Sequence, residues 1–228
     1  MIFPPNVLQW ESLTRSEVDR GGYPFPIEYP LAVCLVESGG SVGQVNPNSG
    51  ASGLMQVMPG TLEGYNKNNS PEIPLWKLRS KDPIYAPEQM RVGIWVMGAF
   101  LKKGFNWLNE TNPDPLISDL IKISDLMYVA GPGLVNKKFG HLSDRSFSAL
   151  VASSPDWQPF RHPKKVWEWT NEKNAAQWDS SAINDWVSGS AVNPPPQQPP
   201  DIAGGNGLLT GLLLLALASW YFSRSARS

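Results

Sequence analysis

The order of apolar and polar residues predicts a chain built mainly from helices. Between residues 116 and 128, apolar side chains recur at the spacing of three and four that places them on one helix face. Residues 86–103 begin with Pro and Glu and end with two lysines and a glycine, as helices favour. No long run alternates with the period of two that is typical of a strand. The pattern therefore predicts a compact, mainly α domain with long loops.

Three further helices are predicted from their ends. Asn6 is placed to cap a helix over residues 7–20, which two glycines end. Pro30 fits the first turn of a short, nearly all-apolar helix over residues 31–38, which also stops at two glycines. We expect another helix to be capped by Ser143 and to continue to residue 152.

The C-terminal part of the chain has a different pattern. Residues 191–201, "AVNPPPQQPPD", are rich in proline, which favours an extended and semi-rigid linker. Residues 202–222 carry no charge and have the length of about 20 residues that crosses a bilayer. Aromatic residues close this run, and a short basic tail over residues 223–228 follows. We therefore expect one domain over residues 1–190, anchored to a lipid bilayer by a single transmembrane helix.

Composition and charge narrow the possible partners. The 19 basic and 20 acidic residues give a net charge of −1, so no charge bias points to nucleic acid. Cys34 is the single cysteine, which excludes an intrachain disulfide, and we expect it to be a small buried hydrophobe. His141 and His162 lack metal-ligand spacing, and we expect both in loops or on the surface rather than in a catalytic site. We expect no metal and no cofactor.

Glu37 is the first candidate for a chemical role. It follows the apolar run "LAVCLV" at the end of a helix that we expect to be buried. Removal from water disfavours the charged form of a carboxyl group, so an acid in this place can hold a proton and deliver it to a leaving oxygen. The alternative is a glutamate that pairs with a Lys or Arg at a helix end, and position alone leaves both open.

Residues 50–61, "GASGLMQVMPGT", favour the chemical role. Gly50 and Gly53 permit close backbone approach and unusual torsion angles, and two methionines supply soft apolar walls. Gln56 offers an amide donor and acceptor without charge. This chemistry suits an extended ligand with hydroxyl and acetamido groups, although a turn under a core has a similar composition.

The motifs resemble those of a known family. The stretch "ESGG…NPNSGASGLMQVMPGT" is similar to the Glu-Ser and Gly-Leu-Met-Gln signatures of the soluble lytic transglycosylases, which have an α+β lysozyme-like fold and act on peptidoglycan. "DPIYAPEQMRVGIWVMGAFLKKG" resembles the central helix of that family, and "MYVAGPGLV" resembles its Tyr-Asn-Ala-Gly-Pro-Gly turn. The resemblance covers about residues 25–140.

The resemblance implies roles for particular residues. Glu37 would be the single catalytic acid and base, the Tyr128 hydroxyl would orient it, and Ser38 would brace it or the adjacent backbone. The substrate-binding residues that the family implies are Ser38, Gly53, Leu54, Met55, Gln56 and Gly131. Met90 and Val129 stand where the family favours Asn, so a polar network behind the site would be weakened or the substrate preference changed.

The resemblance also implies a reaction. Glu37 would protonate the oxygen between MurNAc and GlcNAc of a glycan strand, and the acetamido group of the substrate would support the positive charge. Glu37 would then take the proton of the sugar 6-hydroxyl, so that an anhydro ring closes. Two alternatives remain. Goose-type lysozymes share these motifs and hydrolyse, and a catalytically weak domain could tether a membrane to the wall.

The Trp-rich region, about residues 155–187, lies outside the resemblance. An accessory glycan platform, packing of this region onto the core, and proximity to a bilayer surface would each explain its composition.

The ends of the chain suggest where it works. The first residues lack the basic and apolar regions of a secretory signal, whereas the basic C-terminal tail favours the cytoplasmic side. We therefore expect a membrane-anchored lytic protein of a bacteriophage, in the virion membrane or the host envelope, with virion or envelope proteins as further partners. The alternative is a bacterial inner-membrane enzyme that faces the periplasm and serves wall remodelling, secretion or conjugation.

Overall fold

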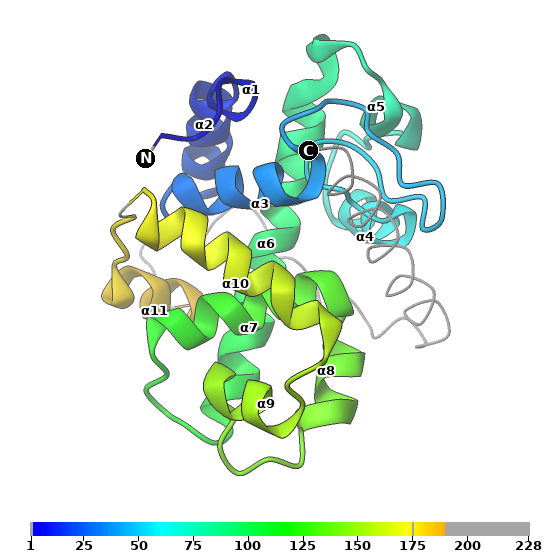
Figure 1. Ribbon diagram of the computed structural model, residues 1–228. Coiled ribbons are helices and arrows are strands. Elements are labelled where there is room, and N and C mark those ends of the chain that lie inside the picture. Colours follow the sequence, from blue (N-terminus) through cyan, green and yellow to red (C-terminus); the bar gives the residue numbers. More distant parts are fainter. Residues whose placement is uncertain (1, 175, 190–228) are drawn as a thin grey trace.

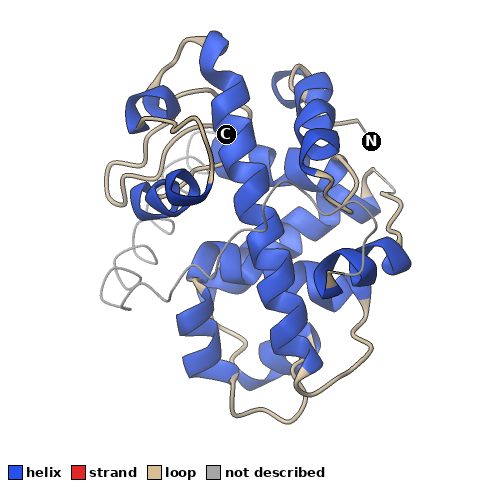
Figure 2. Ribbon diagram, turned by 180° about the vertical axis from the view of Figure 1, so that it is seen from behind, coloured by secondary structure: helices blue, strands red, loops and turns tan. Residues whose placement is uncertain are grey.

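The computed structural model describes residues 2–174 and 176–189 of the chain. Figure 2 shows helices joined by loops, with no strand in these residues. Two isolated bridges, from Val45 to Ser52 and from Ser52 to Val57, are the β-type pairings that the described residues contain. The prediction of a mainly helical chain is confirmed, and its β part is limited to these bridges.

The helices follow one another along the whole described chain. They are α1 (Pro5–Leu8), α2 (Glu11–Gly21), α3 (Glu28–Ser38), α4 (Pro59–Asn68), α5 (Leu75–Arg79), η1 (Pro83–Tyr85), α6 (Ala86–Asn109), α7 (Ile117–Ala130), α8 (Pro132–Phe139), α9 (Phe147–Ser153), η2 (Gln158–Phe160), α10 (Arg161–Trp167), η3 (Glu168–Glu172) and α11 (Ser180–Ser188). Figure 1 shows α6 running through the molecule, and α2, α3, α4, α5, α7 and α11 all contact it.

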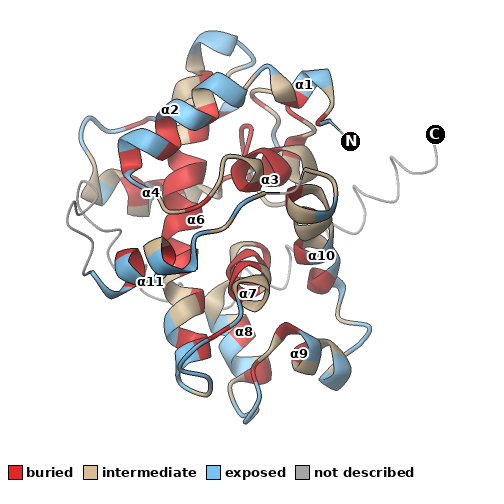
Figure 3. Cartoon of the chain, turned by 90° about the vertical axis from the view of Figure 1, so that its left-hand side faces the viewer, coloured by how far each residue is buried: buried red, intermediate tan, exposed pale blue. Residues whose placement is uncertain are grey.

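The central position of α6 follows from its sequence. The run from Val92 to Leu101 is buried throughout, and a helix that is apolar on every side is stable only inside a core. Helices at the outside, such as α2 and α9, keep an exposed face instead, as Figure 3 shows. The long helix thus contacts both α3 and α7, which carry the site.

Several helix ends differ from the sequence-based predictions, because tertiary contacts decide them. The predicted helix over 86–103 continues to Asn109, and Gly104 lies inside it, where a Cβ would come 2.5 Å from Ser124 Oγ on α7. Gly104 therefore permits the close crossing of two helices and does not end one. Ser146, not Ser143, caps α9 by accepting from the Ala149 N–H at 3.3 Å.

The N-terminal helix is divided in two. Residues 7–20 were expected to form one helix, but α1 and α2 are separated at Gln9 and Trp10. Asn6 does not cap either helix: its amide donates to the Gly39 carbonyl, and the Trp10 indole donates to the Gly40 carbonyl at 2.8 Å. These contacts tie the N-terminal segment to the end of α3 at the expense of helix continuity.

The Trp-rich region packs onto the core. Trp186 is buried, Trp178 lies 5.6 Å from the ring centre of Tyr29, and Trp157 lies 5.0 Å from that of Phe139. Of the three interpretations of this region, packing onto the core is the one that these contacts support.

The linker, the expected transmembrane helix over residues 202–222 and the basic tail lie outside the described residues. Within the part of the chain that the structure describes, none of the helices combines the length and the apolar composition needed to span a bilayer.

Candidate active site

Helix α3 places Glu37 at the edge of the core. Its residues from Tyr29 to Cys34 are buried, and Gly39 ends the helix in the left-handed conformation with φ of 62°. This stop fixes Glu37 in the last turn, where its side chain is 8% exposed. The carboxyl group is therefore largely removed from water while it remains at the end of an element rather than deep within it.

Ser38 holds the backbone next to the acid. It is fully buried, donates to the Cys34 carbonyl at 3.1 Å and accepts from the Gly40 N–H at 3.2 Å. It thus braces the turn after α3, one of the two roles expected for it. Contact of Ser38 with a substrate stays a prediction, and its burial assigns its hydroxyl to the turn.

The glycine-rich loop is a hydrogen-bonded unit. Ser52 and Val57 exchange both backbone hydrogen bonds, at 3.0 and 2.9 Å, and Gly53 has φ of 83°. The Gln56 backbone is also left-handed, with φ of 46°, and its amide nitrogen donates to the carbonyls of Gln44 and Gly53 at 2.9 and 3.0 Å. The Gln56 amide therefore uses its two N–H groups to hold the loop.

The apolar residues of this loop point into the protein. Leu54 and Met55 are fully buried, and Gly93 on α6 makes room for Met55, because a Cβ there would lie 2.3 Å from Met55 Cγ. Their expected contact with a glycan stays a prediction, and in this structure their side chains support the loop from beneath.

Sequence reasoning missed the role of Gln89. This side chain is 1% exposed, and its oxygen accepts from the Gly43 and Leu54 N–H groups at 3.2 and 3.1 Å. Its nitrogen donates to the carbonyls of Lys77 and Ser80, both at 3.0 Å. Gln89 therefore joins the loop to α5 and α6. Gln89 lies in the "PEQ" stretch at the start of α6, but the neighbouring sequence did not indicate which groups its side chain would bind.

Tyr128 on α7 connects the loop with the surroundings of Glu37. Its hydroxyl donates to the Met55 carbonyl, whereas we expected it to contact Glu37. Burial raises the pKa of Tyr128 well above its usual value, and the charges of Glu37 and Asp125 raise it further. The tyrosine is therefore neutral and close to the acid, and its orienting role stays a prediction.

A histidine that we expected in a loop lies next to Glu37. His162 belongs to α10, which Figure 1 shows between α3 and α7. Its Nε2 lies 3.1 Å from Glu37 Oε1, although the N–H bond is not aligned as a hydrogen bond requires. Its Nδ1 lies 2.6 Å from Asp125 Oδ2 on α7, within hydrogen-bond distance. The expectation of a loop or surface position was wrong for His162.

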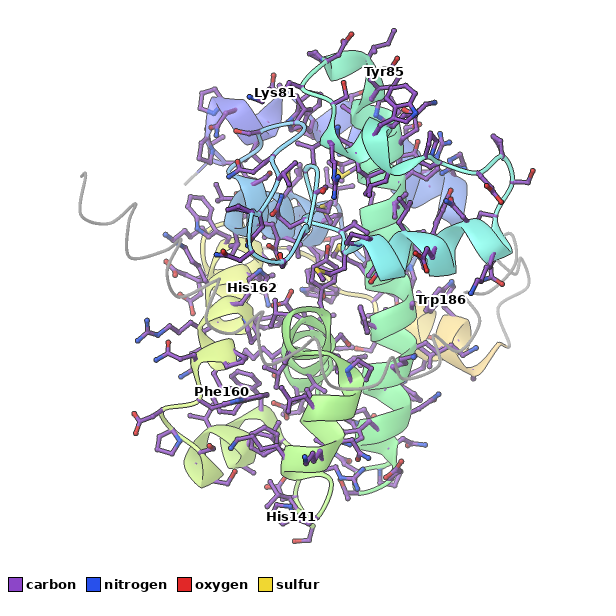
Figure 4. All side chains as sticks on the ribbon, turned by 90° about the vertical axis from the view of Figure 1, so that its right-hand side faces the viewer. Lys81, Tyr85, His141, Phe160, His162 and Trp186 are labelled. Carbon is purple, nitrogen blue, oxygen red and sulfur yellow. The ribbon has the colours of Figure 1, made fainter. Side chains whose placement is uncertain are left out.

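The two histidines differ clearly in their surroundings. His162 has a side chain that is 12% exposed, whereas His141 is exposed in the turn after α8, as expected. Figure 4 shows His141 at the edge of the molecule and His162 within it. The His162 position follows from a tertiary contact between three helices, which no spacing in the sequence records.

The charges around His162 explain its protonation. Burial lowers the pKa of His162, but the neighbouring charges of Asp125 and Glu37 outweigh it and raise the pKa to about 10. The imidazole is therefore a cation at neutral pH. We expected Glu37 to have only apolar neighbours, and its contact with the protonated His162 corrects this expectation.

The departures from the family pattern lie in the core. Met90 is fully buried, with its sulfur 3.7 Å from Thr14 Oγ1, and Val129 is 5% exposed. Apolar packing fills both places where the family favours Asn. Gly131, with φ of 80°, ends α7 and begins the turn to α8, and its expected contact with substrate stays a prediction.

The described residues hold no group of three or more His, Cys, Asp and Glu side chains that could bind a metal ion.

A helical domain that combines a nearly buried glutamate at a helix end with a braced glycine-rich loop has the organisation of an acid–base enzyme. The model of the transglycosylase SLT domain family matches residues 23–150, more than half of the 228 residues. The chain therefore belongs to this family, whose enzymes are lytic transglycosylases that cleave peptidoglycan. No curated protein and no solved structure was found to match the chain.

Proposed function

We propose that the chain is a lytic transglycosylase that cleaves the β-1,4 bond between MurNAc and GlcNAc with Glu37 as its acid and base. The observation that carries the proposal is the place of Glu37. Its side chain is 8% exposed at the end of α3, within the matched range, and its charge acts on Tyr128, which donates a hydrogen bond to the glycine-rich loop.

The chemistry needs one group that first gives and then takes a proton. Protonated Glu37 gives its proton to the glycosidic oxygen as the bond to the anomeric carbon breaks. The acetamido group of the substrate supports the positive charge there, as in other glycosidases that use the substrate in place of a second carboxylate. The ionised carboxylate then accepts the proton of the 6-hydroxyl, whose oxygen closes the anhydro ring.

Glu37→Gln tests the role of the acid. Gln keeps the shape of Glu but cannot transfer a proton, so we expect a loss of about 10²–10⁴-fold in the release of soluble glycan from peptidoglycan. Glu63→Gln is the matched control, because Glu63 is exposed on α4 and should be replaceable without loss. If the Glu37→Gln variant released glycan as fast as the Glu63→Gln variant, Glu37 would have no part in the reaction.

The products separate the proposal from its alternatives. Mass spectrometry of the released fragments should show anhydromuramic ends. Reducing ends would show a goose-type hydrolysis instead. Binding of the full chain to sacculi without release of fragments would show a tether between membrane and wall.

The setting that we propose is a bacteriophage protein anchored in the virion membrane or the host envelope, where it opens the wall locally. The support is the uncharged run over residues 202–222 with its basic tail. The full chain should sediment with membranes, and a Leu213→Arg and Leu215→Arg double variant should not. Recovery of the chain in bacterial membranes but never in purified particles would favour wall remodelling, secretion or conjugation.

A further inference from the structure

The side chain that faces Glu37 lies outside the matched family range. The match ends at residue 150, and α10 begins at Arg161. Helix α10 contacts both α3 and α7, so its His162 is held between an acid from each of them. The segment beyond the match therefore contributes directly to the surroundings of the candidate acid.

Asp125 and His162 are arranged so that the histidine keeps its positive charge. Asp125 is 1% exposed, and its Oδ1 has no hydrogen-bond partner among the described residues, while Oδ2 lies 2.6 Å from His162 Nδ1. A buried anion is expensive unless a cation pairs with it. The hydrogen bond to Asp125 also directs the other ring nitrogen, Nε2, toward Glu37.

The charges around His162 come from two helices. Asp125 of α7 and Glu37 of α3 are the charged groups that act on it. Tyr128 of α7 and Tyr29 of α3 are neutral, because burial raises the pKa of each well above its usual value. Among the other elements that pack on α10, η2 has no titratable residue, and η3 carries Glu168, which pairs with Lys173 at 2.6 Å, and Glu172 at its end.

We propose that His162, fixed by Asp125, is a positioning residue that holds the proton which Glu37 uses and exchanges it with the Glu37 carboxylate. The role rests on the proposed function of Glu37, through which His162 acts. The family match gives no reason to expect it, because the histidine lies beyond its range.

The exchange balances with one proton. A small rotation of the imidazole or of the carboxyl group first aligns Nε2–H with Glu37 Oε1, which lies 3.1 Å away. The Nε2–H bond of His162 then breaks and an Oε1–H bond of Glu37 forms, which leaves a neutral imidazole and a neutral carboxylic acid. Glu37 gives this proton to the leaving oxygen and later receives one from the 6-hydroxyl. Return of that proton to Nε2 restores the starting state, in which His162 carries the proton.

The first test is nuclear magnetic resonance of the imidazole nitrogens in the full chain. The chain has two histidines, so His141→Gln leaves His162 as the single reporter, and this variant should keep wild-type activity because His141 is exposed. We expect the His162 ring to stay doubly protonated from pH 6 to 8.5. Adding Glu37→Gln removes one anion, which should lower the midpoint of the titration by about one pH unit or more.

The second test uses the pH profile of glycan release. Asp125→Asn keeps the size of the side chain but removes its charge, so His162 should lose its proton at lower pH. We expect the alkaline limb of the rate profile to move to lower pH by about one unit or more. His162→Gln should lower the rate by about 10–100-fold, less than Glu37→Gln does.

The proposal is overturned if His162 titrates near its usual value and Glu37→Gln leaves that titration unchanged. It is also overturned if Asp125→Asn lowers the rate without moving the alkaline limb, because a purely structural role has that result. The resonance measurement does not depend on activity. An inactive natural chain with a coupled His162 would reject the proposed function, whereas an active chain with an uncoupled His162 would reject only the proton exchange.

Discussion

Gln89 offers a direct test of what holds the glycine-rich loop in place. Its amide makes four hydrogen bonds, which is its full capacity: two to N–H groups of the loop region and two to the carbonyls of Lys77 and Ser80. Replacement by Met keeps a similar shape but leaves the Gly43 and Leu54 N–H groups buried without partners. Each unsatisfied buried donor costs about 1–3 kcal/mol, so the free energy of unfolding should fall by roughly 2–6 kcal/mol.

Urea unfolding of the full chain measures this loss. Gln9→Met is the matched control, because Gln9 is exposed and its amide donates only to the nearby Asn6 carbonyl at 2.8 Å. We expect the control to change the free energy of unfolding by no more than about 0.5 kcal/mol. Limited proteolysis should also cut residues 41–58 faster in Gln89→Met than in the control.

A second substitution separates the two halves of the Gln89 network. Gln89→Glu keeps an oxygen for the Gly43 and Leu54 N–H groups but places a carboxylate oxygen against two carbonyls. We expect it to be destabilised at neutral pH, with a gap to the natural chain that narrows on acidification, because a protonated acid can donate once. If Gln89→Met unfolds within about 1 kcal/mol of the Gln9→Met control, the loop holds itself and our reasoning is refuted.

Two further predictions concern the same part of the molecule. Gly93→Ala should lower the melting temperature, because its Cβ would lie within 2.4 Å of Met55 atoms. Gly64→Ala is the control and should raise the melting temperature, because its Cβ would have nothing within 4 Å. Equal shifts in the two variants would contradict this packing. Burial lowers the pKa of His162 but two anions raise it to about 10, so the folded chain holds this proton more tightly than the unfolded chain. The stabilisation is therefore complete below about pH 6.5 and declines by about 1.4 kcal/mol per pH unit above it. Unfolding of His162→Gln between pH 6 and 8.5 should lack this slope.

Local signals were sufficient for the elements that carry Glu37 and Tyr128. The apolar run before Glu37 and the two glycines after it predicted the end of α3, and Gly131 ends α7. These ends depend on backbone conformations that a few adjacent residues decide. The sequence could also indicate the acid itself, because a lone carboxylate after a long apolar run is unusual.

Other features depend on contacts between distant residues. The position of Gly104 in the sequence is typical of a helix end, but in the structure it permits the close crossing of α6 with α7 at Ser124. Gln89 reads as an ordinary residue near a helix start, and its four partners lie 9 to 46 residues away in the chain. Periodicity describes which face of an element is apolar, but it does not say which elements meet, so these roles could not be predicted.

The same reason explains why the charged part of the site was missed. Glu37, Asp125 and His162 come from three helices, and no short motif contains two of them. Asp125 lies three residues before Tyr128, on the same side of α7, which was the single signal that a second acid could lie near the site. Its burial was not predictable, because a buried aspartate needs a cation whose position only the fold decides.

The burial of this cluster is itself an argument about function. An ion pair inside a protein is a weak source of stability, since apolar residues of similar volume often fill its place equally well. Asp125 and His162 are nonetheless buried between apolar helices, with one carboxylate oxygen of Asp125 unpaired in the described residues. The arrangement does have one clear chemical effect, which is to keep a proton within 3.1 Å of the Glu37 carboxylate in a place that water hardly reaches. A group that must give and then recover a proton in each cycle gains from such a partner, and stability alone gives no comparable reason for it.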